Sequence, residues 1–129
     1  MTRINCGIPP GVLSDKHLLS EHREIKRIPN HVAKHWDKIT KEGIQSIPPK
    51  FCLGKGHVRF FFDKGEYTYE RYEQIYLECI KRGFNVTYYG HAWDIYSDLG
   101  IQWYKNYDPT IDDVALILER INLRVSSVK

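Results

Sequence analysis

The sequence predicts a mainly α, single compact domain of three helices joined by long irregular connections. Its 129 residues, 42% of them hydrophobic, are enough for one core and too few for two ordinary domains, so residues 1–129 are taken as one domain. Apolar residues recur at helical spacing in three segments, and the stretches between them are interrupted by proline and glycine. These observations together favour a helical fold.

The first helix is expected to begin at Ser14 or Asp15, either of which can cap it after the Pro9-Pro10-Gly11 break. Its apolar stripe consists of Leu18, Ile25, Ile28, Val32 and Trp36. The opposite face is polar and cationic and carries Lys16, Ser20, Arg23, Arg27, His31 and Lys34, with Glu24 at its edge. Pro29 removes a backbone donor and clashes with the preceding turn, so it should kink the helix or end it near Ile28.

The second helix is predicted from Glu66 to Arg82, with Gly83 as its C-terminal stop. Its inward residues are Tyr69, Tyr72, Tyr76, Cys79 and Ile80. The third helix should open at Asp108-Pro109, a capping acid followed by a proline. Its inward residues are Ile111, Val114, Ala115, Leu118 and Ile121. This assignment places Arg120 and Arg124 on the outer face.

The connections, residues 44–64 and 84–107, have no clear periodicity. Within the first, the apolar run Val58 to Phe62 reads as a short strand or a buried turn, and irregular packing is favoured because a lone strand has no partner. Within the second, Trp103 to Tyr107 combines aromatic residues with a lysine. Such a segment either stacks on nucleic-acid bases or fills the core, and the sequence leaves both readings open.

Composition restricts the environment of the protein. Its net charge is +3, from 19 Lys and Arg against 16 Asp and Glu, which is compatible with nucleic-acid binding without requiring it. An odd number of cysteines, three, argues against a disulfide framework and for a reducing compartment. No apolar run reaches membrane length and no signal peptide is apparent, so we expect an intracellular protein that does not bind membranes.

Two motifs suggest ligands only weakly. His31 and His35 lie one helical turn apart, a geometry that suits a metal, but no third ligand is suitably spaced, so no metal site is predicted. Gly54-Lys55-Gly56 lacks the rest of a phosphate-binding loop and is read as a turn.

The N-terminus is the strongest candidate for chemistry. A small residue after the initiator methionine favours removal of Met1, which would expose the Thr2 α-amine. The ordinary pKa of an α-amine lies well below that of a lysine, so more of it is neutral and nucleophilic near pH 7. Like-charge repulsion from convergent arginines would lower that pKa further, and the candidates are Arg3, Arg23 and Arg27. Glu24 is the natural carboxylate beside it, although charges at this helical spacing are also common on a solvated surface.

Several blocks then resemble one known family. They are Met1-Thr2-Arg3-Ile4-Asn5, Asp15-Lys16-His17-Leu18, Arg23-Glu24 with Arg27, Gly56-His57-Val58, Phe60-Phe61-Phe62-Asp63-Lys64, and Glu78-Cys79-Ile80-Lys81-Arg82-Gly83-Phe84-Asn85. Their order and approximate spacing resemble the phage-type pyrimidine-dimer DNA glycosylase, also called UV endonuclease V. The resemblance extends from Met1 to about Arg124 and is specific, because separate blocks agree.

This resemblance implies a DNA repair enzyme. Such an enzyme excises UV-induced pyrimidine dimers as a DNA N-glycosylase and then nicks the backbone by an associated AP lyase activity, without a cofactor. By resemblance, Thr2 supplies the nucleophile and Glu24 the essential carboxylate. The implied DNA-binding residues are Arg3, Lys16, His17, Arg23, Arg27, Arg120 and Arg124. The implied partner is double-stranded DNA containing lesions, bound by a monomer in the cytoplasm of a virus-infected or bacterial cell.

Departures from the family pattern affect the expected lesion range. Lys16 replaces a glutamine and His22 a tyrosine, and no aromatic, basic tail follows the third helix. We therefore expect weaker discrimination between lesions. The alternatives are the same chemistry on other base lesions or abasic sites, or a non-catalytic DNA-binding module on the same scaffold, and a free Thr2 amine discriminates between an enzyme and a module.

Overall fold

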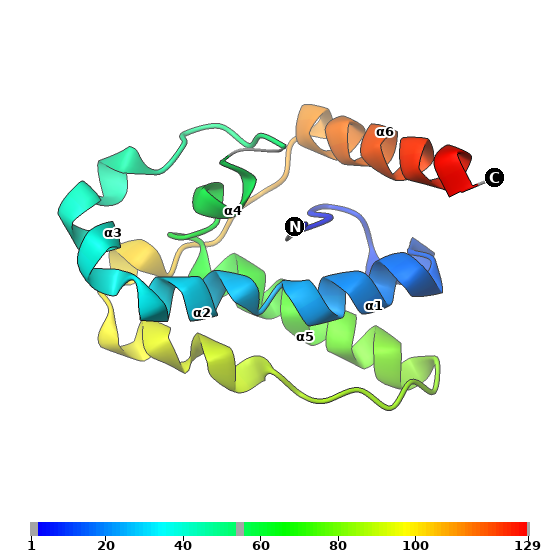
Figure 1. Ribbon diagram of the computed structural model, residues 1–129, viewed down its shortest axis with the longest axis horizontal. Helices are drawn as coiled ribbons and strands as arrows, with labels where there is room; N and C mark the ends of the chain where they lie inside the picture. The colour runs from blue at the N-terminus through cyan, green and yellow to red at the C-terminus, as the bar shows by residue number, and fades with distance from the viewer. Residues whose placement is uncertain (1–2, 54–55, 129) are drawn as a thin grey trace.

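A computed structural model of the protein describes residues 3–53 and 56–128, with side chains described as far as Ile121 (Figure 1). The α-helices within these residues are α1 (Asp15–Glu24), α2 (Arg27–Lys34), α3 (Trp36–Glu42), α4 (His57–Phe60), α5 (Gly65–Lys81) and α6 (Ile111–Val128). Short 3₁₀ segments are η1 (Pro10–Val12), η2 (Ile44–Ser46), η3 (Gly90–Asp98) and η4 (Ile101–Trp103). The mainly α fold class is confirmed, but the expected number of three helices is wrong.

Helices α1, α2 and α3 occupy the part of the chain in which the sequence predicted one long first helix. Ser14 caps α1 as expected, because its hydroxyl accepts a hydrogen bond from the His17 backbone N–H at 3.1 Å. The helix ends at Glu24 and not near Ile28. Pro29 has no N–H to offer the Ile25 carbonyl one turn earlier, so the break falls before the proline and Pro29 lies in the first turn of α2.

The predicted second helix is α5, and its end is the one expected. Gly83 has a φ of 84°, a left-handed conformation that favours glycine. The N–H groups of Gly83 and Phe84 donate to the carbonyls of Ile80 and Cys79 at 2.9 Å each, which satisfies the last turn of the helix. The buried stripe of α5 is made of Thr68, Arg71, Tyr72, Ile75 and Cys79, whereas Ile80, predicted to face inward, is 48% exposed.

Helix α6 begins later than predicted and presents a different face. Thr110 caps it in place of Asp108, since the Asp113 N–H donates to the Thr110 hydroxyl and the Thr110 N–H to the Asp113 carboxylate, both at 3.1 Å. Ile117 is fully buried, while Ile111 is 88% and Leu118 45% exposed. The predicted inward stripe is therefore right in part: Val114 and Ile121 pack against the core, but Ile111, Ala115 and Leu118 are exposed and the buried Ile117 was not predicted.

The connections are mainly aromatic packing. Residues Val58 to Phe62 form the turn of α4 and the bends after it, with Phe60, Phe61 and Phe62 buried, so the buried-turn reading is confirmed. Trp103 is 5% exposed and lies edge-on to Trp36, with ring centroids 5.1 Å apart. Trp103 thus packs in the core, as one of the two readings expected, whereas Lys105 and Asn106 of the same segment are exposed.

The arrangement of the helices creates the site. Figure 1 shows α1 and α2 following one another, with α1 packed against α5 and α2 against η3, while α6 runs on the other side of the molecule. The N-terminal segment, defined as residues 4–8, lies between α1 and α6 (Figure 1). Ile4 and Cys6 within it are fully buried. Residues 4–6 and 8 of the N-terminal segment are therefore part of the core and are held close to two helices.

Candidate active site

A polar pocket of about 270 Å³ lies where the N-terminal segment, α1 and α6 meet. Its lining consists of Arg3, Asn5, Lys16, His17, Ser20, Glu21, Arg23, Glu24, Arg120 and Ile121. Six of the residues predicted from the sequence are in that set: Arg3, Lys16, His17, Arg23, Glu24 and Arg120. The pocket thus gathers cations and carboxylates from sequence positions more than 100 residues apart.

Arg3 carries the clearest sign of an anion site. One nitrogen of its guanidinium, Nη1, is buried and has no hydrogen-bond partner among the described residues. A buried polar group without a partner is costly, and a positively charged donor is best satisfied by an anion. Arg3 therefore suits a phosphate oxygen entering the pocket.

Glu24 is recessed, and Arg23 stands at the rim. The Glu24 side chain is 15% exposed, against 60% for Arg23, and 3.8 Å separate the Arg23 Nη2 from the Glu24 Oε2. That contact is long and partly solvated, so it adds little to stability. Arg23 is consequently able to turn toward a ligand without breaking a strong ion pair.

The start of α1 contributes Lys16 and His17. Lys16 is exposed, and His17 Nδ1 lies 2.8 Å from the hydroxyl of Ser14, the cap of the helix. The first turn of a helix carries partial positive charge from its backbone N–H groups. This end of the pocket is therefore suited to negatively charged ligands.

Arg120 lies on the inner face of α6, which corrects the predicted outer position. Its Nη2 donates to the Oδ1 of Asn5 at 2.7 Å. Arg120 is three residues after the buried Ile117, so the rotation of α6 that buries Ile117 also turns Arg120 toward the N-terminal segment. The outer position of Arg120 was predicted from an inward stripe that did not include Ile117, and it is wrong.

Arg27 does not line this pocket. It is exposed at the first position of α2, after the break that follows Glu24. The expected convergence of Arg27 with Arg23 assumed one continuous helix, and the break removes that assumption. Thr2 lies outside the described residues, as does the side chain of Arg124.

The sequence interpretation missed a buried ion pair below the pocket. Glu21 and Arg71 are 1% and 4% exposed. Arg71 Nε donates to Glu21 Oε2 at 2.7 Å and Nη2 to Oε1 at 3.0 Å. A signal was present, because both residues fall on the apolar stripes of their helices, where a charge requires a partner.

His57, which the sequence interpretation also missed, holds the first residue of the N-terminal segment, Ile4. Its Nε2 accepts a hydrogen bond from the Ile4 backbone N–H at 3.0 Å, and its Nδ1 lies 2.9 Å from the Cys52 carbonyl. Only the neutral ring, protonated on Nδ1, satisfies both contacts. Burial lowers the pKa of His57 from 6.5 to about 4.

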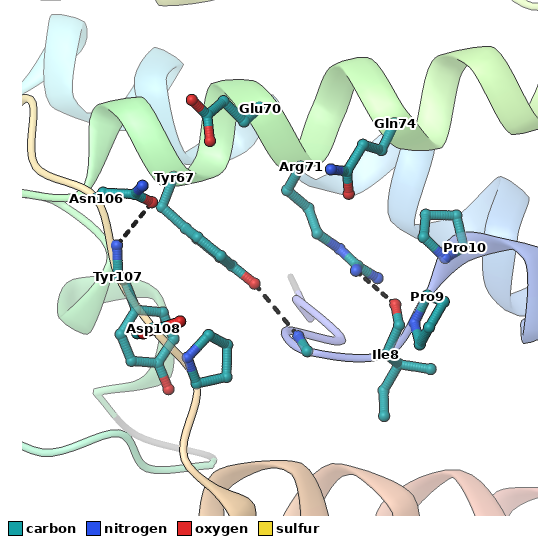
Figure 2. A pocket seen from close by; sticks show the side chains of 12 residues that line it. Ile8, Pro9, Pro10, Tyr67, Glu70, Arg71, Gln74, Asn106, Tyr107 and Asp108 are labelled. Carbon is teal, nitrogen blue, oxygen red and sulfur yellow. Dashed lines mark hydrogen bonds between the residues drawn. The ribbon is translucent and has the colours of Figure 1, made fainter.

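A second pocket, of about 430 Å³, lies beside the N-terminal segment (Figure 2). Figure 2 shows Tyr67 and Arg71 pointing from α5 toward the segment. The Gly7 N–H donates to the Tyr67 hydroxyl at 3.3 Å, and Arg71 Nη1 donates to the Ile8 carbonyl at 2.6 Å. Two side chains of α5 that line this pocket thus hold the N-terminal segment in place by hydrogen bonds.

In residues 3–53 and 56–128 no group of three or more His, Cys, Asp and Glu side chains could hold a metal ion, and His31 and His35 have no third ligand near them. Over the same part of the chain, no helix has the length and apolar character needed to cross a membrane.

The chain was compared with known protein families. The family model described as pyrimidine dimer DNA glycosylase matches residues 1–89, more than half of the 129 residues. The match includes the N-terminal segment and α1 through α5, and thus every lining residue of the site except Arg120 and Ile121. The chain therefore belongs to the pyrimidine dimer DNA glycosylase family, and it is a DNA repair glycosylase whose substrate is DNA.

Proposed function

We propose that the protein is a bifunctional DNA N-glycosylase and AP lyase that excises pyrimidine dimers from double-stranded DNA, with the Thr2 α-amine as nucleophile. The observation that carries the proposal is the pocket, in which Glu24 stands among Arg3 and other cations beside the beginning of the chain. The cations can bind the negatively charged phosphates of DNA, and the carboxylate can transfer protons at the reacting sugar.

The proposed reaction begins with the neutral amine attacking the sugar C1′. The bond between C1′ and the base nitrogen breaks, and the base leaves with the electron pair and takes up one of the two amine protons. The C1′–O4′ bond then opens and O4′ takes the second amine proton, which leaves an imine between the protein and C1′. Glu24 is positioned to stabilise the cationic sugar and to transfer these protons.

The lyase step uses the imine as an electron sink. Removal of a C2′ proton sends its electron pair into a C2′–C3′ double bond, while electrons of the C3′–O bond leave with the 3′ phosphate. Water then releases the protein from the imine. No redox step occurs, so the chemistry requires neither a cofactor nor a metal.

The cations of the pocket would hold the DNA. The unpartnered Nη1 of Arg3 supports a direct phosphate contact deep in the site. Arg23 and Lys16, both exposed, would contact phosphates nearer the rim. These contacts fix the position of the sugar and carry little sequence information.

Borohydride trapping tests the proposal. Reduction during reaction with dimer-containing or abasic duplex should yield a covalent protein–DNA adduct whose modified peptide begins at Thr2. Protein with a selectively acetylated N-terminus is the matched control, and it should give no adduct while still binding DNA. An adduct that maps to Lys16 or another lysine would refute the assignment of the nucleophile. Excision of abasic sites but not of dimers would support the alternative substrate range.

A further inference from the structure

We propose that the buried ion pair of Glu21 and Arg71 is a positioning device that holds the N-terminal segment in register with Glu24. The inference rests on the proposed function, because it concerns the placement of the nucleophilic amine. It assigns a role to two residues that have no contact with the substrate in the proposed mechanism.

Stability alone does not account for the ion pair of Glu21 and Arg71. Removing two charges from water costs several kcal/mol per ion, and apolar residues of similar volume often replace a buried pair without loss of stability. The pair joins α1 to α5 through a two-pronged contact, at 2.7 and 3.0 Å. Apolar packing between these helices would join them equally well, so the charges call for another explanation.

Both members of the pair also form hydrogen bonds with the N-terminal segment. Glu21 Oε1 accepts a hydrogen bond from the Asn5 side-chain amide at 2.9 Å. Arg71 Nη1 donates to the Ile8 carbonyl at 2.6 Å, a contact visible in Figure 2. The pair thus fastens the segment at two points that are three residues apart, and apolar substitutes cannot make either bond.

The pair also connects the N-terminal segment to the part of α1 that carries Glu24. Glu21 lies three residues before Glu24 on α1, so both point to the same face of the helix, and both line the pocket. Asn5, which Glu21 holds, follows Thr2 by three residues, so at most about 11 Å of extended chain separates them. Fixing Asn5 to α1 therefore limits where the amine can move relative to Glu24.

The contacts continue to the DNA side of the pocket. Asn5 Oδ1 accepts from Arg120, while its amide donates to Glu21. The side chain of Asn5 is 95% buried and is oriented by a donor on one side and an acceptor on the other. The ion pair consequently helps to set the position of a side chain of the segment that lies between α1 and α6.

The test compares two variants with a matched control. The double substitution Glu21→Leu with Arg71→Met keeps the volume and removes both bonds to the segment. Arg71→Lys keeps a positive charge opposite Glu21. A single ammonium group cannot make both the two-pronged contact with Glu21 and the hydrogen bond to the Ile8 carbonyl. Tyr72→Phe is the control, because it removes a buried contact between the same helices, from Tyr72 to His22 at 3.0 Å, that does not involve the segment.

Imine formation is measured in single turnover at saturating abasic DNA, together with the Kd for that DNA. A misplacement of 1 Å costs roughly 10²-fold in rate, so both variants should trap DNA at least about tenfold more slowly. Their Kd should change less than about threefold, because the cations of the pocket remain. Hydrogen exchange in a peptide covering the N-terminal segment should be faster in the variants, and Tyr72→Phe should match the unsubstituted protein in all three measurements.

The outcomes separate the two proposals. Unchanged trapping rates in the double variant, or in Arg71→Lys if the double variant does not fold, would overturn the positioning role and leave the proposed function standing. Equal slowing in Tyr72→Phe would also overturn it, since the effect would then be general loosening. Failure of the unsubstituted protein to form any adduct would overturn the proposed function and this inference together.

Discussion

Acid should destabilise the protein through His57. The ring is 2% exposed and surrounded edge-on by Phe51 and Phe61, and it is neutral because its Nε2 must accept the Ile4 N–H. Protonation would put a second N–H opposite the N–H of Ile4. The imidazolium would also face the positive charges of Arg3 and Arg120, which further lower its pKa.

The size of the effect follows from the pKa of His57. It is about 4 in the folded protein, against 6.5 as the ordinary value. Because each pKa unit is worth about 1.4 kcal/mol, the difference corresponds to about 3 kcal/mol of folding free energy. The unfolded chain binds the proton more readily, so this contribution is fully present above pH 6.5 and is lost as the pH falls toward 4.

Urea unfolding between pH 4 and pH 8 measures the contribution. His57→Gln is the suitable variant, because the amide oxygen still offers an acceptor for Ile4 but does not titrate. Between pH 7 and pH 4 the unsubstituted protein should lose about 3 kcal/mol more than the variant. His22, whose pKa is also lowered by burial, is present in both proteins and cancels in the difference.

Parallel stability curves for the two proteins would refute this reasoning. They would mean that His57 binds a proton as readily in the folded state as in the unfolded one. The hydrogen bond from Ile4 would then not hold the ring in its neutral form. A steeper curve for His57→Gln would contradict the sign of the effect as well.

Three further predictions concern the site and its support. Glu24→Gln should lower the excision rate by about 10² to 10⁴ while lesion binding is retained, measured by single-turnover excision and by Kd, and near-normal excision would exclude the role in proton transfer. Arg120→Met should weaken binding to all DNA sequences and flatten the salt dependence by about one phosphate, and an unchanged salt slope with a lower Tm would indicate a purely structural arginine. Gly7→Ala should destabilise more than Gly83→Ala: both have positive φ, which costs roughly 1–2 kcal/mol, but the new methyl group would lie 2.6 Å from Val114 only at Gly7. Equal losses in urea unfolding would show that α6 moves away without cost.

Local signals in the sequence determined where α1 begins and where α5 ends. Ser14 caps α1 and Gly83 ends α5, because a hydroxyl at a first turn and a left-handed glycine after a last turn act on neighbouring backbone groups only. Pro29 correctly predicted a break, because a proline also acts on neighbouring backbone groups. It has no N–H to donate to the Ile25 carbonyl one turn earlier, so the helix ends at Glu24, earlier than predicted.

The chemistry of the site was accessible from the sequence in part. The order of the blocks from Met1 to Asn85 indicated the family, and the family match over residues 1–89 confirmed it. Among the predicted residues, Arg3 and Glu24 do meet in one pocket. The roles proposed for them stay predictions. Arg27 was grouped with them by the family resemblance and by a helix expected to continue to about Ile28, whereas α1 ends at Glu24.

Tertiary packing alone decided which face of α6 is inner and which buried charges hold the N-terminal segment. Both apolar stripes of α6 satisfy the helical period, so the choice depends on the partner surface that buries Ile117 and brings Arg120 to Asn5, 115 residues away. Glu21 and Arg71 are separated by 50 residues and have ordinary helical surroundings in the sequence. A charge within an apolar stripe indicates that some partner is required, but which partner meets it depends on how two helices pack, and local sequence does not encode that contact.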